Sequence, residues 1–108
     1  MRVWFLGVAA VAVFGVNAAS AADLEAAKKK VSEVCQACHG MDGNSQVPDY
    51  PKLAGQNQDY LAKALRDYKS GARKDPTMSG FAGTLTPQDI DNLAAYFSTQ
   101  PAVLQSRM

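Results

Sequence analysis

The chain has 108 residues, of which 47% are apolar and 19% are charged, a balance typical of one small globular domain. Its 11 basic and 10 acidic residues leave a formal net charge of +1, so the composition gives no support to binding of nucleic acid or of an anionic membrane surface. The sequence contains no internal repeat and no sustained alternation typical of β-strands, so the patterns that remain are helical.

Residues 1–21 have the layout of a secretory signal peptide. Arg2 precedes an apolar run from Val3 to Val16, and the small residues Ala19-Ser20-Ala21 form an A-x-A cleavage site. The alternative is an uncleaved membrane anchor, since residues 3–22 reach the roughly 20 that span a bilayer. The apolar core is short for an anchor, and no basic cluster follows it directly. We therefore expect cleavage, a periplasmic location, and one mature domain at residues 22–108, without stable membrane insertion.

That mature domain is small for a self-sufficient hydrophobic core. Domains of this size bury a smaller share of their apolar surface than larger ones, and they commonly depend on a disulfide, a metal or a bound cofactor. The sequence therefore predicts that a group outside the amino-acid list completes the domain.

The first predicted helix extends from Asp23 to about Cys38. Asp23 is suited to the N-cap and Glu25 to the first turn, and Gly40 provides a stop just beyond. The residues expected on its buried face are Leu24, Ala27, Val31, Val34 and Cys38. The lysine run 28–30 is expected on the solvent face, and steering of an acidic partner is the alternative role.

Two more helices are predicted further along the chain. The first runs from Gln58 to Ser70 and ends at Gly71. The second has Thr86 as its N-cap and Pro87 at N1, and it ends before Pro101. Their apolar stripes are Tyr60, Leu61, Ala64, Leu65 and Tyr68 in the first and Ile90, Leu93, Ala94 and Phe97 in the second.

The segments between the helices, residues 40–56 and 71–85, are rich in helix breakers and are predicted to be loops. We therefore expect an all-α domain with three main helices. Its functional groups are expected in the loops that these helices hold.

Both cysteines and the single histidine lie in one short stretch, VCQACHGMDG, as Cys35, Cys38 and His39. Cysteines at i and i+3 of a helix project from the same side, and the residue after the second lies beside them. The C-x-x-C-H spacing is the attachment pattern of c-type haem, in which two thiols add to the vinyl groups and the imidazole meets the iron. We expect one covalently bound haem c, attached through Cys35 and Cys38, with its iron held by His39.

This window has two other interpretations. A structural or redox disulfide suits the oxidising compartment that a signal peptide implies, yet a thioredoxin-like site belongs in a βαβ setting that the chain does not show. A zinc site needs four ligands, and no second cysteine or histidine pair completes the set.

The sixth iron ligand has few candidates. No other histidine exists, so the choice falls on the methionines of the mature chain. Met41 lies two residues from His39 and cannot reach around the macrocycle, and Met108 is the terminal residue. Met78 lies in the segment DPTMSGF, far enough along the chain to return on the opposite face of the haem. A methionine that merely fills a core gap is the alternative.

These residues resemble the class I, His/Met-ligated, monohaem cytochromes c, and within that class a single domain of the cytochrome c4 group of periplasmic electron carriers. The matching stretches are CQACHGMDGNS, PKLAGQ followed by YL and L, YKSGAR, and TMSG with LTPQDIDNLAAYFSTQ. The resemblance covers nearly all of residues 23–100. Members of the cytochrome c4 group usually hold two haem domains in tandem, whereas this chain has a single C-x-x-C-H window, so the expectation is a c4-like monohaem unit.

The resemblance implies a small class I cytochrome c fold, with loops wrapped around the haem, thioether bonds at Cys35 and Cys38, and axial ligation by His39 and Met78. It also implies that the carbonyl of Pro51 accepts a hydrogen bond from the outer ring nitrogen of His39. Tyr96 is expected to pack across the first helix near Ala27. For Arg73, contact with a haem propionate and a solvated surface position stay equally open.

Iron with both axial positions filled favours electron transfer over substrate chemistry, and Met/His ligation raises the reduction potential. An apolar shell around Leu61, Leu65, Ile90 and Leu93 acts in the same direction. No paired carboxylates and no nucleophile with a base accompany the site, so an enzyme is not expected. Gln36, Ala37 and Met41 are expected to surround the exposed haem edge.

We expect an electron carrier between respiratory redox partners, such as a quinol-oxidising cytochrome complex, a terminal oxidase or a periplasmic dehydrogenase. The alternatives are the haem subunit of a larger dehydrogenase or oxidase, and a haem sensor with a displaceable Met78.

Overall fold

The computed structural model describes residues 22–103. The expected signal peptide, residues 1–21, and the terminal Met108 lie outside the described residues. The helical elements in chain order are α1 (Leu24–Lys30), the π-helical segment η1 (Val31–Cys35), α2 (Gln36–His39), α3 (Gln58–Ser70), α4 (Pro76–Ala82) and α5 (Pro87–Ser98). Between residues 22 and 103 no β-strand occurs.

The first predicted helix is confirmed in its extent, but its middle is wider than an ordinary α-helix. The Asp23 side chain caps α1 by accepting a hydrogen bond from the amide of Ala26 at 2.9 Å. One π-helical turn, η1, then joins α1 to α2, which ends at Gly40 with φ +77°. Single π-helical turns occur frequently at functional sites. Leu24, which was expected on the buried face, is 45% exposed.

The predicted loop at residues 71–85 is wrong in part, because it contains the helix α4. Asp75 caps this helix by accepting hydrogen bonds from the amides of Thr77 and Met78, both at 2.9 Å. Pro76 occupies the first helical position, where its missing N–H costs nothing. Asp-Pro therefore begins a helix here, although in the sequence it has the composition of a turn.

The other two helices have the predicted signals. α3 matches the predicted range, with Asn57 as its N-cap and Gly71 in the left-handed conformation at its end. α5 begins with a reciprocal capping box, in which Thr86 and Asp89 each accept a hydrogen bond from the other's amide.

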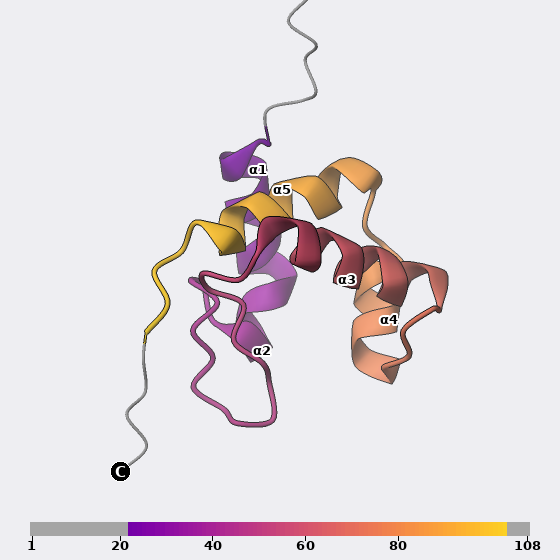
Figure 1. Ribbon diagram of the computed structural model, residues 1–108, viewed down its shortest axis with the longest axis horizontal. Helices are drawn as coiled ribbons and strands as arrows, with labels where there is room; N and C mark the ends of the chain where they lie inside the picture. Colours follow the sequence, from indigo (N-terminus) through magenta and orange to yellow (C-terminus); the bar gives the residue numbers. More distant parts are fainter. Residues whose placement is uncertain (1–21, 104–108) are drawn as a thin grey trace, which may run out of the picture.

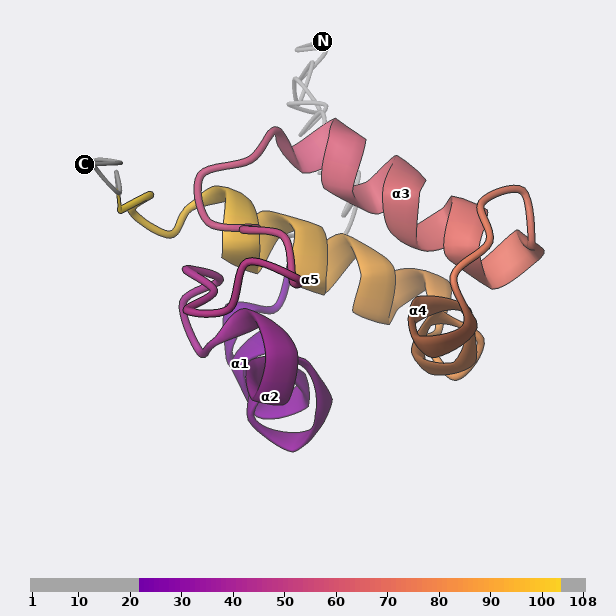
Figure 2. The ribbon, with the colours of Figure 1, turned by 90° about the horizontal axis from the view of Figure 1, so that it is seen from below.

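The hydrophobic core lies where α5 packs against both α1 and α3 (Figures 1 and 2). Its buried members are Ala27, Val31, Leu61, Ala62, Leu85, Ile90, Leu93, Ala94 and Phe97. Tyr96 is half-buried against this cluster, which includes Ala27, as expected for packing of α5 on α1. Its hydroxyl also donates a hydrogen bond to the carbonyl of Met41 at 2.7 Å, which joins the start of the following loop to α5.

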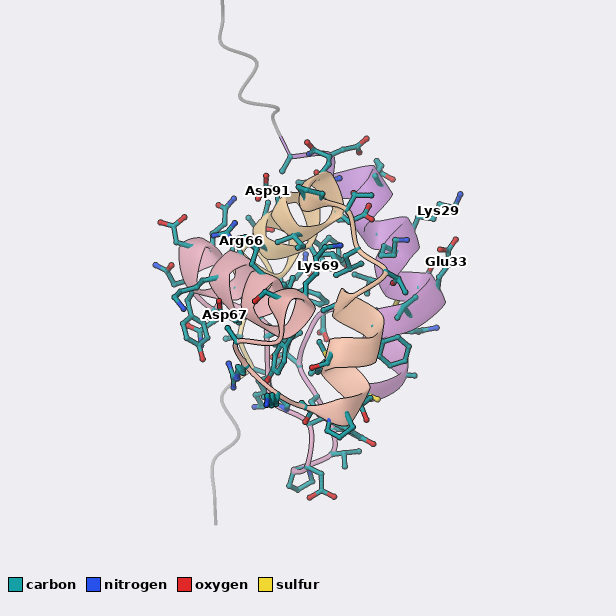
Figure 3. The ribbon with its side chains drawn as sticks, turned by 90° about the vertical axis from the view of Figure 1, so that its right-hand side faces the viewer. Lys29, Glu33, Arg66, Asp67, Lys69 and Asp91 are labelled. Atoms are coloured by element: carbon teal, nitrogen blue, oxygen red, sulfur yellow. The ribbon has the colours of Figure 1, made fainter. Side chains whose placement is uncertain are left out.

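The outer faces of the helices carry the charged side chains. Lys29 and Glu33 project outward from α1 and η1, and Arg66 of α3 lies 3.9 Å from Asp91 of α5 at the surface (Figure 3). Such exposed pairs contribute little to stability. Within residues 22–103, no helix has the length and apolar character needed to cross a bilayer.

Candidate functional site

One cavity brings together the residues that the sequence singled out. Cys35 of η1, Cys38 and His39 of α2 and Met78 of α4 all line it, together with side chains of α3 and α5. Its volume is about 300 Å³, within the range of roughly 300–1,000 Å³ found for sites of small molecules and cofactors. The cavity joins elements that are far apart in the sequence.

The two cysteines stand on one wall of this cavity as free thiols. Burial raises the pKa of the Cys35 thiol to about 11, and the positive charge of Lys30 opposes this effect only in part. Redox-active cysteines instead have lowered pKa values and react as thiolates. The environment of Cys35 thus disfavours the reactive thiolate that a thioredoxin-like dithiol needs.

His39 is held in one orientation beside the cysteines. Its side chain is 6% exposed, and Nδ1 lies 2.8 Å from the carbonyl oxygen of Pro51, which confirms the expected contact. Because a carbonyl can only accept, Nδ1 is the donor, and in the neutral ring Nε2 is the nitrogen with the free lone pair. A histidine fixed in this way through its other nitrogen is the usual arrangement of a metal ligand.

Met78 reaches the same cavity from a different side of the molecule. It is half-buried in α4, and the cap at Asp75 fixes its backbone. Figures 1 and 2 both show α2 and α4 apart, with α4 beside the end of α3. The cavity therefore has an imidazole on the α2 wall and a thioether on the α4 wall.

Two tyrosines and an arginine also line the cavity at α3 and just beyond it: Tyr60, Tyr68 and Arg73. The guanidinium of Arg73 lies 4.8 Å from the ring centroid of Tyr68. The pKa of Arg73 is raised, foremost by a side-chain hydrogen bond with Tyr60. Arg73 lines the cavity although it is exposed, so it lies where an anionic group of a ligand could meet it. The sequence placed both tyrosines on an apolar stripe but gave no sign of their pairing with Arg73.

Some residues expected near the haem do not line the cavity. Leu61, Leu65 and Leu93 line it, but Ile90 is buried in the core instead. Gln36, Ala37 and Met41 were expected around the haem edge, and none of them lines the cavity; Met41 packs against the core. The exposed aromatic side chains that do line the cavity are Tyr50, Tyr60 and Phe81.

A family model named Cytochrome c matches residues 24–101. The chain belongs to the cytochrome c family. It is 48% identical over 90 residues to cytochrome c4 of Stutzerimonas stutzeri, covering 75% of this chain and 42% of that protein. The crystal structure of reduced recombinant cytochrome c4 from Pseudomonas stutzeri superposes with a TM-score of 0.71 at 46% identity, covering 78% of this chain and 48% of that one. The class I cytochrome c fold is thereby confirmed.

Other relatives within the cytochrome c family differ in length. Cytochrome c-554(548) of Halomonas halodenitrificans is 40% identical over 83 residues, which cover 74% of this chain and 99% of that protein. The thiosulfate dehydrogenase electron acceptor of Thiomonas intermedia is 39% identical over 92 residues, which cover 84% and 42%. The chain thus spans about two fifths of the cytochrome c4 relative and nearly the whole of cytochrome c-554(548).

The cofactor of this cytochrome c is haem c. The site fits that group, because two free thiols in C-x-x-C-H spacing and a histidine with a free Nε2 open into one cavity. The lining offered by leucine, phenylalanine and tyrosine side chains suits the apolar faces of a porphyrin.

Proposed function

We propose that this cytochrome c is a periplasmic electron carrier that transfers one electron at a time through a His/Met-ligated haem c. The observation that supports this most is the convergence of Cys35, Cys38, His39 and Met78 on a single cavity. Residues 39 positions apart in the sequence, His39 and Met78, present a nitrogen and a sulfur ligand to it from separate helices.

Each of these residues has a separate role in the proposal. Cys35 and Cys38 form the thioether bonds that keep the cofactor attached. His39 binds through Nε2, while its Nδ1–H stays on Pro51 and prevents the ring from rotating. Met78 supplies the thioether ligand, which stabilises the reduced state relative to the oxidised one. The haem supplies exchange of one electron between the ferrous and ferric states.

This ligand set favours a carrier over an enzyme. If His39 and Met78 both held the iron, no position would be left for a substrate. The apolar side chains of Leu61, Leu65 and Leu93 exclude water from the cavity, which disfavours the additional charge of the oxidised state.

The location and partners follow from the export signal predicted at residues 1–21, with a mature domain at residues 22–108. The partners are other redox proteins of that compartment: a quinol-oxidising cytochrome complex, a terminal oxidase or a periplasmic dehydrogenase. Nucleic acid is not among them, because the basic and acidic residues nearly balance.

One preparation tests attachment, processing and ligation together. The full chain is produced in a host that matures c-type haem, and its intact mass and visible spectrum are recorded. We expect the mass of residues 22–108 plus one haem, and in the ferric protein a thioether-to-iron charge-transfer band. Colourless protein with two free or mutually bridged thiols would contradict the proposal.

A second candidate function is the haem subunit of a larger dehydrogenase. It is favoured by the relative named as a thiosulfate dehydrogenase electron acceptor. It is also favoured by the structure of thiosulfate dehydrogenase (TsdBA) from Marichromatium purpuratum, with a TM-score of 0.71 at 28% identity over 79% of this chain and 20% of that one. Stable co-purification with a dehydrogenase under mild conditions would support this role.

A sensor with a displaceable ligand would instead show loss of Met78 from the iron on reduction, which the spectrum of the ferrous protein reveals.

A further inference from the structure

The buried side chain of Asn44 holds the end of the described chain. Asn44 is 8% exposed, and its Nδ2 donates a hydrogen bond to the carbonyl of Pro101 at 2.9 Å. Its Oδ1 accepts a hydrogen bond from the amide of Val103 at 2.8 Å. One side-chain amide thus bonds to an acceptor and a donor of the backbone, as an adjacent strand would. Because both polar atoms of a buried amide need partners, this arrangement fixes residues 101–103.

A second side chain, that of Lys52, also holds residues 101–103. Lys52 lies next to Pro51, which orients His39. Lys52 Nζ donates a hydrogen bond to the carbonyl of Val103 at 2.8 Å. Lys52 directly follows Pro51, whose carbonyl accepts the hydrogen bond from His39 Nδ1. Residues 101–103 therefore bond to both Asn44 and Lys52. These two residues bound the segment that carries the Pro51 carbonyl.

Other contacts hold the ends of that segment, and its middle is the more exposed part. The backbone also joins its two ends directly, because the carbonyl of Gly43 accepts from the amides of Leu53 and Ala54, and Ser45 Oγ lies 3.3 Å from the carbonyl of Cys38. Val47 and Tyr50 are 45% and 40% exposed. The hydrogen bond from the Tyr50 amide to the Val47 carbonyl lies within the segment, whereas the Tyr50 ring lies edge-on to the ring of His39, with centroids 6.4 Å apart. The position of Pro51 accordingly depends on how firmly the two ends of the segment are held.

We propose that residues 101–103 act as a strap, and that Asn44 is a positioning residue that holds the Pro51 carbonyl on His39 through this strap. The inference rests on the proposed function, since it takes His39 as an iron ligand. A firm acceptor at Nδ1 makes the imidazole a stronger donor to the metal, which favours ferric iron. Loosening the strap weakens that hydrogen bond, so the reduction potential rises.

The haem-loaded protein offers a matched pair of variants for the test. Asn44→Ala removes both side-chain hydrogen bonds to residues 101–103. Asn92→Ala removes another buried asparagine, whose Oδ1 accepts from the Asp23 amide at 2.9 Å and so ties the start of α1 to α5. The readouts are the free energy of unfolding, the reduction potential, and the solvent exchange of the His39 Nδ1 proton by NMR.

We expect both variants to be less stable but only Asn44→Ala to change the site. At a fixed applied potential its ferrous-to-ferric ratio should rise about threefold, which is about 28 mV for one electron. The Nδ1 proton should exchange faster than in Asn92→Ala. An unchanged potential and exchange rate in Asn44→Ala, or equal changes in both variants, would overturn the proposal.

A milder pair keeps the test decisive if Asn44→Ala does not fold. Val103→Pro removes the amide donor at an exposed position, whereas Val103→Ala retains it. Only Val103→Pro should shift the potential and the exchange rate. Wild-type protein without haem or without the thioether band would contradict the proposed function. Wild-type protein with both, but with all variants unaltered at His39, would contradict the strap alone.

Discussion

Asp75 Oδ1 accepts a hydrogen bond from the backbone amide of Met78 at 2.9 Å. The same oxygen accepts from the amide of Thr77, so a single carboxylate sets the first turn of α4. The residue that caps this short helix therefore also fixes the backbone that carries the proposed sulfur ligand.

We predict that Asp75→Ala weakens Met78 ligation as well as the helix. Loss of an N-cap costs about 1 kcal/mol of unfolding free energy. Thr86→Ala removes the corresponding cap of α5, where Thr86 Oγ1 accepts from the Asp89 amide at 3.0 Å, and serves as the control. On warming, the thioether-to-iron band should disappear before global unfolding in Asp75→Ala but together with it in Thr86→Ala. Identical behaviour of the two variants would show that the cap has no particular effect on Met78.

A second prediction separates the proposed ligand from the other half-buried methionine. Leucine is close in volume to methionine, so neither Met78→Leu nor Met41→Leu should greatly alter packing. Met78→Leu should abolish the charge-transfer band and favour ferric iron at least about tenfold, which lowers the potential by about 59 mV or more. Met41→Leu should retain the band and the potential, because Met41 packs against the core. Retention of the band in Met78→Leu would exclude Met78 as the ligand.

The sequence predicted those parts of the fold whose signals are local. The bounds of α3 and the start of α5 follow from capping residues and apolar spacing that lie within a few residues of each other. α4 was missed because Asp75-Pro76 has the composition of a turn, and only the structure shows that its carboxylate caps a helix. The π-helical turn at Val31–Cys35 leaves no spacing signal in so short a stretch.

The site was predictable to a different degree in each of its parts. Cys35, Cys38 and His39 stand out because their spacing is the attachment pattern itself. The contact of Pro51 with His39 came from the resemblance to a family rather than from any pattern in the residues. The hydrogen bond from Asn44 to Pro101 joins residues 57 positions apart, and no local pattern in the sequence predicts such a contact.

We predict that Gly43→Ala destabilises the loop beside the site more than Gly71→Ala destabilises the end of α3. Both glycines have positive φ, +77° and +86°, so each alanine costs roughly 1–2 kcal/mol of backbone strain. At Gly43 an added Cβ would also lie 2.8 Å from both the Ala54 nitrogen and the Phe97 ring, whereas nothing lies within 4 Å at Gly71. Chemical denaturation of the two haem-loaded variants should show the larger loss in Gly43→Ala. Equal losses would mean that the loop shifts away from Phe97 without cost.

The last prediction concerns acid stability. Hydrogen bonding to Asn44, first through its backbone amide, lowers the pKa of Asp42 below its ordinary value of 3.8. A carboxyl group whose pKa is lower in the folded than in the unfolded chain stabilises the fold at pH values above its unfolded pKa. That contribution is lost as the pH falls through the folded pKa.

The melting temperature of Asp42→Asn should therefore fall less than that of the wild type between pH 6 and about pH 3. Asp59→Asn, at the exposed start of α3, removes the same charge away from Asn44 and is the charge-matched control. If Asp42→Asn and Asp59→Asn change alike, the acid sensitivity reflects net charge and not the hydrogen bond to Asn44.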